Sequence, residues 1–162
     1  METASSGVLR VLLLGRAVAS LATLHDGRPF ASMVPFAATT AGGRLQLVVH
    51  VSGLATHTRD MRSFPDVCLM IMALESDAVP PQALPRVSIS GRARFVPGDD
   101  PEHASLKAAY LGKFPEAADL FQFGDFSIVA IEPVSTRFVA GFARAMTLAP
   151  ESLAAAVADE AV

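Results

Sequence analysis

The sequence predicts a mainly β (α+β) fold, a six- to seven-stranded antiparallel β-barrel, closed or split, with short peripheral helices. Apolar and polar residues alternate in short segments that are separated by turns rich in Gly, Asp and Pro. Helical patterns are few and lie between these segments. Hydrophobic residues make up 51% of the chain and charged residues 18%, and barrel closure removes the exposed strand edges that so apolar a chain would tolerate poorly.

The size and charge of the chain limit the possible classes of protein. The 162 residues predict a single domain over residues 1–162, and the net charge of −3 argues against a nucleic-acid partner. The apolar composition favours a subunit interface. The single cysteine, Cys68, cannot form an intrachain disulfide and fits a reducing cytoplasm. The N-terminus lacks the pattern of a signal or membrane helix, so we expect no membrane association.

Seven strands are expected in chain order. They cover residues 19–24, 29–38, 44–51, 66–73, 86–96, 127–132 and 135–139. Asp26-Gly27 is a strong hairpin signal between the first two strands, and Pro133 is expected to separate the last two. The strand over residues 66–73 is almost wholly apolar and is therefore expected to be buried on both faces.

Helices are expected at both ends of the chain and at the connections. The N-terminal helix (residues 1–16) is amphipathic from residue 5 onwards, and a short helix lies in the C-terminal tail, residues 147–162. Further helices are expected over residues 56–63, 101–112 and 115–120. The helix over residues 56–63 ends before Pro65, because the residue before a proline disfavours the helical conformation.

The junction between the strand over residues 44–51 and the following helix has two interpretations. Ser52, Thr56, Thr58 and Arg59 offer hydroxyl and guanidinium donors at a helix start, where free N–H groups and the helix dipole favour an anion such as a phosphate. Alternatively, the Ser and Thr side chains only cap the helix. Local chemistry alone favours the second interpretation, because helix caps are common.

Few other residues suggest chemistry. The histidines lack the spacing of a metal site, so no metal is expected, and no Ser–His–Asp or paired-carboxylate arrangement indicates catalytic residues. His25 is expected in an exposed turn and Asp60 on an exposed helix face. Arg92 and Arg94 are expected on an exposed basic strand face.

The order of four motifs resembles a known family. These motifs cover residues 21–36 (LATLHDGRPFASMVPF), 43–71, 85–96 and 123–145. The chain resembles the pyridoxamine 5'-phosphate oxidase-like FMN-binding split barrels, and in particular their branch related to haem-utilisation proteins, over roughly residues 15–146.

The resemblance implies a homodimer with FMN at the subunit interface. Four groups of residues match the family's cofactor-binding segments: Ser32, Met33, Val34 and Pro35 beside the flavin ring; His50, Val51 and Ser52 at the next strand end; Thr56, His57, Thr58 and Arg59 at the phosphate; and Phe142 and Arg144 from the partner subunit. With the resemblance added to the local chemistry, the phosphate interpretation of Thr58 and Arg59 becomes the favoured one.

The implied function is that of an FMN-dependent oxidoreductase acting on a small-molecule substrate. The residues after Arg144 include no His or Arg, whereas the family's pyridoxal phosphate-forming oxidases read their substrate with such residues and its haem-degrading members hold iron with a C-terminal His. The alternative is a non-catalytic flavin- or haem-binding protein related to the haem-utilisation proteins.

Overall fold

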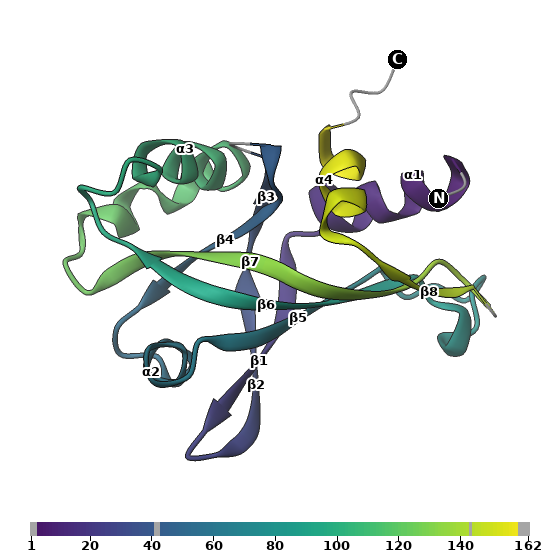
Figure 1. The fold of residues 1–162 in the computed structure, drawn as a ribbon, viewed down its shortest axis with the longest axis horizontal. Coiled ribbons are helices and arrows are strands. Elements are labelled where there is room, and N and C mark those ends of the chain that lie inside the picture. Colours follow the sequence, from purple (N-terminus) through teal and green to yellow (C-terminus); the bar gives the residue numbers. More distant parts are fainter. Residues whose placement is uncertain (1–2, 41–42, 143, 159–162) are drawn as a thin grey trace.

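The computed structural model describes residues 3–40, 43–142 and 144–158. Parts of the predicted N-terminal helix, of the turn after Thr40, of the segment around Phe142 and of the C-terminal tail lie outside the described residues. Within these ranges, one antiparallel sheet of eight strands curls into a split barrel (Figure 1). This confirms the predicted fold class.

The strands follow the order β2-β1-β5-β6-β7-β4-β3, and β8 pairs with β7. Their bounds are β1 Val18–His25, β2 Arg28–Pro35, β3 Ala37–Thr39, β4 Gln46–Ser52, β5 Asp66–Met72, β6 Arg86–Val96, β7 Phe126–Val139 and β8 Ala145–Leu148. The Asp26-Gly27 hairpin joins β1 to β2, and both residues have positive φ (51° and 73°), as a type I′ turn requires. The sheet order places β2 and β3 at its two ends, so the barrel is split there.

Helices cover parts of this barrel. Their bounds are α1 Thr3–Arg10, continued by a π-helical turn Val11–Gly15, α2 Thr56–Ser63, α3 His103–Lys113 and α4 Pro150–Ala158, with 3₁₀ helices Pro81–Ala83 and Pro115–Gln122. Helices α1 and α4 pack together (Figure 1), and the Arg10 guanidinium donates to the carbonyls of Ala156 (3.2 Å) and Val157 (2.8 Å). In the described ranges, no helix combines the length and apolarity needed to cross a membrane.

Strand β4 is buried on both faces. Leu47 and Val49 point into the main core inside the curled sheet, which also takes in Leu9, Leu12 and Leu13 from the N-terminal helical segment. Val48 points the other way, into a second cluster with Leu106 and Tyr110 of α3. Helix α3 therefore covers the outer face of the sheet beside β4.

Strand β5 differs from its prediction. Its residues alternate between buried and half-buried, with Cys68, Met70 and Met72 on the half-buried side. The expectation that this strand is buried on both faces is wrong for the single chain, because the described helices leave its outer side uncovered. An apolar strand face without cover is a candidate contact surface.

The last long strand also differs from its prediction. β7 runs unbroken through Pro133, because a β-bulge accommodates the proline: Ser90 pairs with Ser135 and Gly91 with Pro133, which leaves Val134 without a partner in this ladder. Gly91 suits this close approach, since a Cβ atom there would lie 2.6 Å from the Glu132 carbonyl oxygen. The short strand β8 in the C-terminal region was not predicted.

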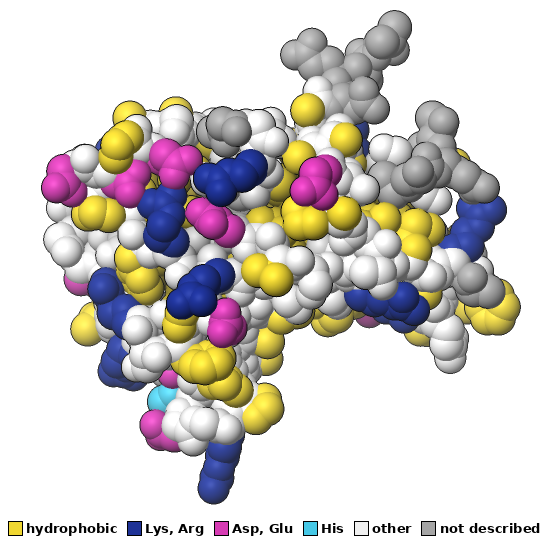
Figure 2. Space-filling view, viewed as in Figure 1, with side chains coloured by type: hydrophobic (Ala, Val, Ile, Leu, Met, Phe, Trp, Pro, Cys, Tyr) yellow, Lys and Arg dark blue, Asp and Glu magenta, His cyan; other side chains and the backbone are white. Residues whose placement is uncertain are grey.

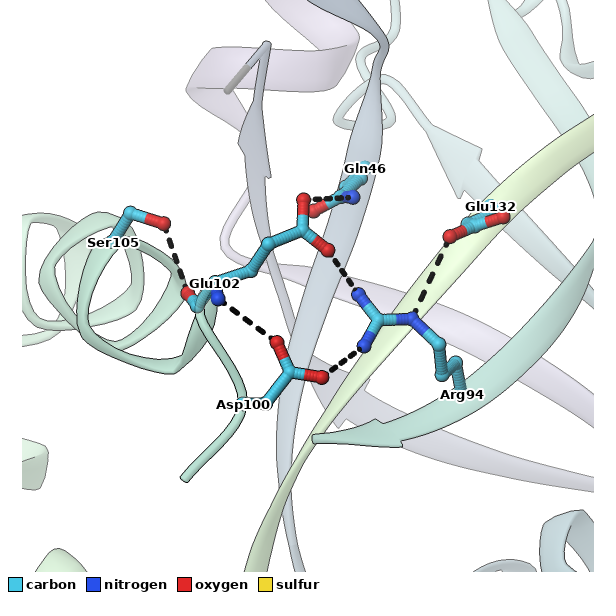
Figure 3. Close-up of polar contacts among 6 residues, drawn as sticks. All are labelled: Gln46, Arg94, Asp100, Glu102, Ser105 and Glu132. Atoms are coloured by element: carbon cyan, nitrogen blue, oxygen red, sulfur yellow. Dashed lines mark hydrogen bonds and ion pairs between the residues drawn. The ribbon is translucent and has the colours of Figure 1, made fainter. Parts of the chain in front are cut away.

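A charged cluster joins the start of α3 to the barrel (Figure 3). The Arg94 guanidinium contacts Asp100 at 2.8 Å, Glu102 and, at 3.6 Å, Glu132. Gln46 of β4 donates to the second carboxylate oxygen of Glu102. The predicted free basic face is therefore wrong for Arg94, whose charge is neutralised by carboxylates on three sides.

Candidate functional site

The hairpin end of β1 and helix α2 form a connected polar cluster. The Asp60 carboxylate accepts a hydrogen bond from the Thr23 hydroxyl at 2.8 Å through Oδ2, and Oδ1 lies 2.8 Å from Nδ1 of His25. Asp60 is only 5% exposed, so its expected place on an exposed helix face is wrong. No local sequence pattern predicts this pair, because His25 and Asp60 are far apart in the chain and meet only through strand–helix packing.

Each member of the His25–Asp60 pair stabilises the charged form of the other. The hydrogen bond to Asp60 raises the pKa of His25 above its ordinary value. Burial opposes the charged form of Asp60, but hydrogen bonds from His25 and Thr23 and the positive charges of His25 and Arg59 hold its pKa below the usual range. Asp60 is thus a buried carboxylate that fixes the orientation of the His25 imidazole.

The structure brings two of the predicted cofactor-binding segments together. The Ser32 hydroxyl of β2 lies 3.1 Å from Nδ1 of His57 at the start of α2. Along the same strand, Met33 is 64% exposed on the outer face of the sheet, Val34 is buried in the core, and Pro35 is exposed. The side chains of this predicted segment therefore face two sides of the sheet.

The end of β4 is enclosed by aromatic side chains. His50 is 8% exposed and its ring stacks on Phe121, while its Nδ1 atom is buried without a hydrogen-bond partner among the described residues. Burial lowers the pKa of His50 to about 4, helped by the charge of Lys107. Val51 is part of the core. Ser52 donates to the Asp125 carboxylate at 2.7 Å.

The expected phosphate donors at the start of α2 differ in their exposure to solvent. Thr56 is half-buried and Arg59 is exposed, but Thr58 is fully buried, and its hydroxyl has no partner in the part of the chain that the structure describes. Ala55 occupies the N-cap position and offers no side-chain acceptor. A single ligand at the surface of the chain could reach Arg59 but not the Thr58 hydroxyl.

The last predicted segment lies elsewhere. Phe142, which is 78% exposed, and Arg144, which is also exposed, belong to the connection between β7 and β8. This connection is at the opposite end of the sheet from α2 (Figure 1). Within one chain, these two residues do not meet the other predicted residues.

Open cavities line the outer face of the sheet and its hairpin end. A cavity of about 440 Å³ lies over β1, β5 and β6, and a cavity of about 390 Å³ lies between the hairpin and α2; both are lined by Leu24 and Phe64. A third cavity, of about 470 Å³, is lined by Met33, Met70 and Met72. On the face seen in Figure 2, hydrophobic side chains form a band across the middle of the molecule, whereas charged side chains gather over α3.

Comparisons with known proteins place these features in context. A family model described as Pyridoxamine 5'-phosphate oxidase matches residues 7–140. Over 85% of the chain, the sequence is 34% identical to the chloroplastic heme oxygenase HOZ of Arabidopsis thaliana and 29% identical to the heme oxygenase HutZ of Vibrio cholerae. The chain spans 40% of the length of HOZ and 77% of the length of HutZ.

A solved structure agrees with these relatives. The heme-binding protein of Mycobacterium smegmatis superposes with a TM-score of 0.81 at 29% identity, over 96% of this chain and 62% of that protein. These findings contradict the predicted FMN cofactor and the predicted FMN-dependent oxidoreductase, since the two curated relatives are heme oxygenases and this solved structure is a heme-binding protein. The sequence prediction was wrong because a fold and a phosphate-like helix start do not by themselves specify the cofactor.

Proposed function

The chain belongs to the pyridoxamine 5'-phosphate oxidase family, and from this premise we propose that it binds haem. The observation that carries the proposal is the similarity over 85% of the chain to two heme oxygenases, at 34% and 29% identity. This corresponds to the haem-binding alternative of the sequence analysis. A reducing cytoplasm, expected from the single cysteine, is part of the same proposal.

The donor set of the chain fits haem. Haem needs an apolar surface for its ring, a cation near its propionates and an axial ligand for its iron. The cavity between the hairpin and α2 offers Leu24 and Phe64 as apolar walls, Arg59 as a cation and His25 as an imidazole. When bound, haem would supply the chemistry of its iron, while the chain would supply binding, orientation and electrostatics.

The proposal includes a homodimer with the cofactor at its interface. The uncovered outer face of the sheet supports a second copy of this chain as the partner. In the strand register, Ser20 lies opposite Met70 and Ala22 opposite Cys68, and Cys68 lies opposite Ser90 on the other side. These side chains are small or apolar and uncharged, as the centre of a subunit interface tends to be.

The test is an absorption spectrum of the purified protein with haem and, separately, with FMN, each followed by gel filtration. We expect a sharp Soret band that elutes with the protein, and an FMN spectrum that elutes with the small molecules. A protein that emerges without a Soret band would refute haem binding. Serum albumin freed of haem is the positive control for haem retention, and a protein without a cofactor site is the negative control.

A further inference from the structure

The His25–Asp60 pair has the geometry of an oriented metal ligand. Nδ1 of His25 lies 2.8 Å from Oδ1 of Asp60, whose other oxygen accepts from Thr23. Both carboxylate oxygens are therefore engaged, and the carboxylate is 5% exposed. The imidazole itself is 46% exposed. A buried carboxylate thus holds a histidine ring that solvent and ligands can reach.

This arrangement defines which ring nitrogen is available. When Nδ1–H donates a hydrogen bond to the Asp60 carboxylate, the lone pair of the neutral ring is on Nε2. Metal-binding histidines commonly donate their other ring N–H to a carboxylate, which fixes the tautomer and raises the basicity of the ligand. Among the described charged groups, the Asp26 carboxylate lies 3.7 Å from Nε2 and is 91% exposed, and the Arg59 guanidinium lines the same cavity.

The surroundings of His25 are partly apolar and partly charged, because its cavity is lined by Leu24 and Phe64 together with Arg59, Asp26 and Asp60. The ring of Phe30 lies 5.8 Å from that of His25, and Phe30 and Phe64 are 37% and 44% exposed. Arg59 lines the same cavity and is exposed, so its guanidinium can pair with a carboxylate. The cavities of about 390 and 440 Å³ are each within the range of about 300–1,000 Å³ typical of small-molecule sites.

The other histidines are less suited to this role. His50 is 8% exposed and stacked on Phe121, so a ligand could reach it only if the aromatic cluster moved. Nδ1 of His57 is hydrogen-bonded to the Ser32 hydroxyl. This hydroxyl is neutral, so it orients and polarises the ring less than a carboxylate does. His103 begins α3, and this helix lies on the other side of the molecule from the β1–β2 hairpin (Figure 1).

We propose that His25, oriented by Asp60, is the axial ligand of the haem iron in this chain. The inference rests on the proposed haem-binding function and adds the identity of the iron ligand. Asp60 is a positioning residue, since it acts on the iron through His25. The site would lie at the β1–β2 hairpin, with Arg59 beside the propionates.

The experiment compares the wild type with H25A, D60N, H57A and H103A, each checked for folding by circular dichroism. Haem affinity, the ferric absorption and electron paramagnetic resonance spectra, and the iron–histidine stretch of the ferrous form are measured. We expect H25A to bind haem at least about 10-fold more weakly and to lose the iron–histidine stretch, and added imidazole to restore an axial nitrogen ligand. D60N should keep the stretch but lower its frequency, because the neutral amide supports the ring less. H103A, which removes the histidine at the start of α3, is the control and should match the wild type.

The outcomes separate the two proposals. Wild-type protein that retains no haem would refute the proposed function. Wild-type protein that retains haem, together with H25A of unchanged affinity and iron–histidine stretch, would overturn only the assignment of His25. Loss of the stretch in H57A instead of H25A would also overturn it, in favour of the helix histidine.

Discussion

The imidazole of His50 lies parallel to the ring of Phe121, with 3.7 Å between the ring centroids and 5° between the planes. Tyr110 and Phe126 complete the aromatic surroundings, with centroids 5.8 and 5.0 Å from that of His50. Because this environment excludes water, the neutral ring is favoured and its pKa falls to about 4.

This shift predicts a loss of stability in acid. Between about pH 6.5, the ordinary histidine pKa, and about pH 4, the unfolded chain binds a proton at His50 that the folded chain does not. The stability contributed by His50 is therefore complete above pH 6.5 and is lost as the pH falls towards 4. Urea unfolding at pH 7 and pH 4.5 should show a loss about 2–3 kcal/mol larger in the wild type than in H50L. Equal losses in the two proteins would contradict this role of His50.

Gly91 should not tolerate a side chain. In G91A, the new Cβ atom would lie 2.6 Å from the Glu132 carbonyl oxygen and 3.0 Å from Cγ2 of Ile131, so the β-bulge would have to shift. We expect a loss of about 3 kcal/mol in the free energy of unfolding. G98A is the matched control, because no atom lies within 4 Å of its Cβ position, and its effect should stay within about 0.5 kcal/mol. Similar melting curves for the two variants would argue against the tight contact.

Arg94 should matter more for stability than Arg92 on the same strand. R94M leaves Asp100, Glu102 and Glu132 without their shared cation. Since the Arg94 side chain is 34% exposed, we expect a loss of about 1–2 kcal/mol rather than the cost of a fully buried pair. R92M removes an exposed guanidinium and should have little effect. Chemical unfolding in low salt measures both, and equal effects would show that the cluster contributes nothing.

A charge on the outer face of β5 should separate the proposed dimer. Met70 lies in the middle of the uncovered sheet face, opposite Ser20 on one side and Ser88 on the other. M70E would place two carboxylates in a desolvated interface, which is strongly unfavourable. Sedimentation velocity should give a dimer for the wild type and a monomer for M70E, with A104E on the exposed side of α3 remaining dimeric. A wild-type protein that sediments as a monomer would refute the dimer.

Local signals predicted much of the fold. The Asp26-Gly27 pair encodes the positive φ angles of its turn, and Pro65 limits α2 to the predicted residues 56–63. The alternation of residues 86–96 matched β6, because its pattern results from one face packing on the core. Each of these features depends on residues close together in the sequence.

Features that depend on distant residues were not predictable in the same way. The hydropathy of Asp66–Met72 could not distinguish cover by a helix of the same chain from cover by another molecule, so the burial of β5 was overestimated. The burial of Asp60 depends on His25 and Thr23, which no local pattern connects to it. Comparison with the relatives was needed to distinguish haem from FMN, because both cofactors combine an apolar ring with anionic groups.

The strand order has a consequence for how fast the chain can fold. Leu47 of β4 pairs with Ile131 of β7, so about half of the chain lies between the two partners. Hairpins such as β1–β2 form within about 1–10 μs, but closing this long loop costs entropy before its contacts are gained. Folding should therefore proceed on the slower timescale of about milliseconds to seconds typical of sheets with distant partners. During that time β4, which is buried on both faces in the folded protein, is exposed to other chains.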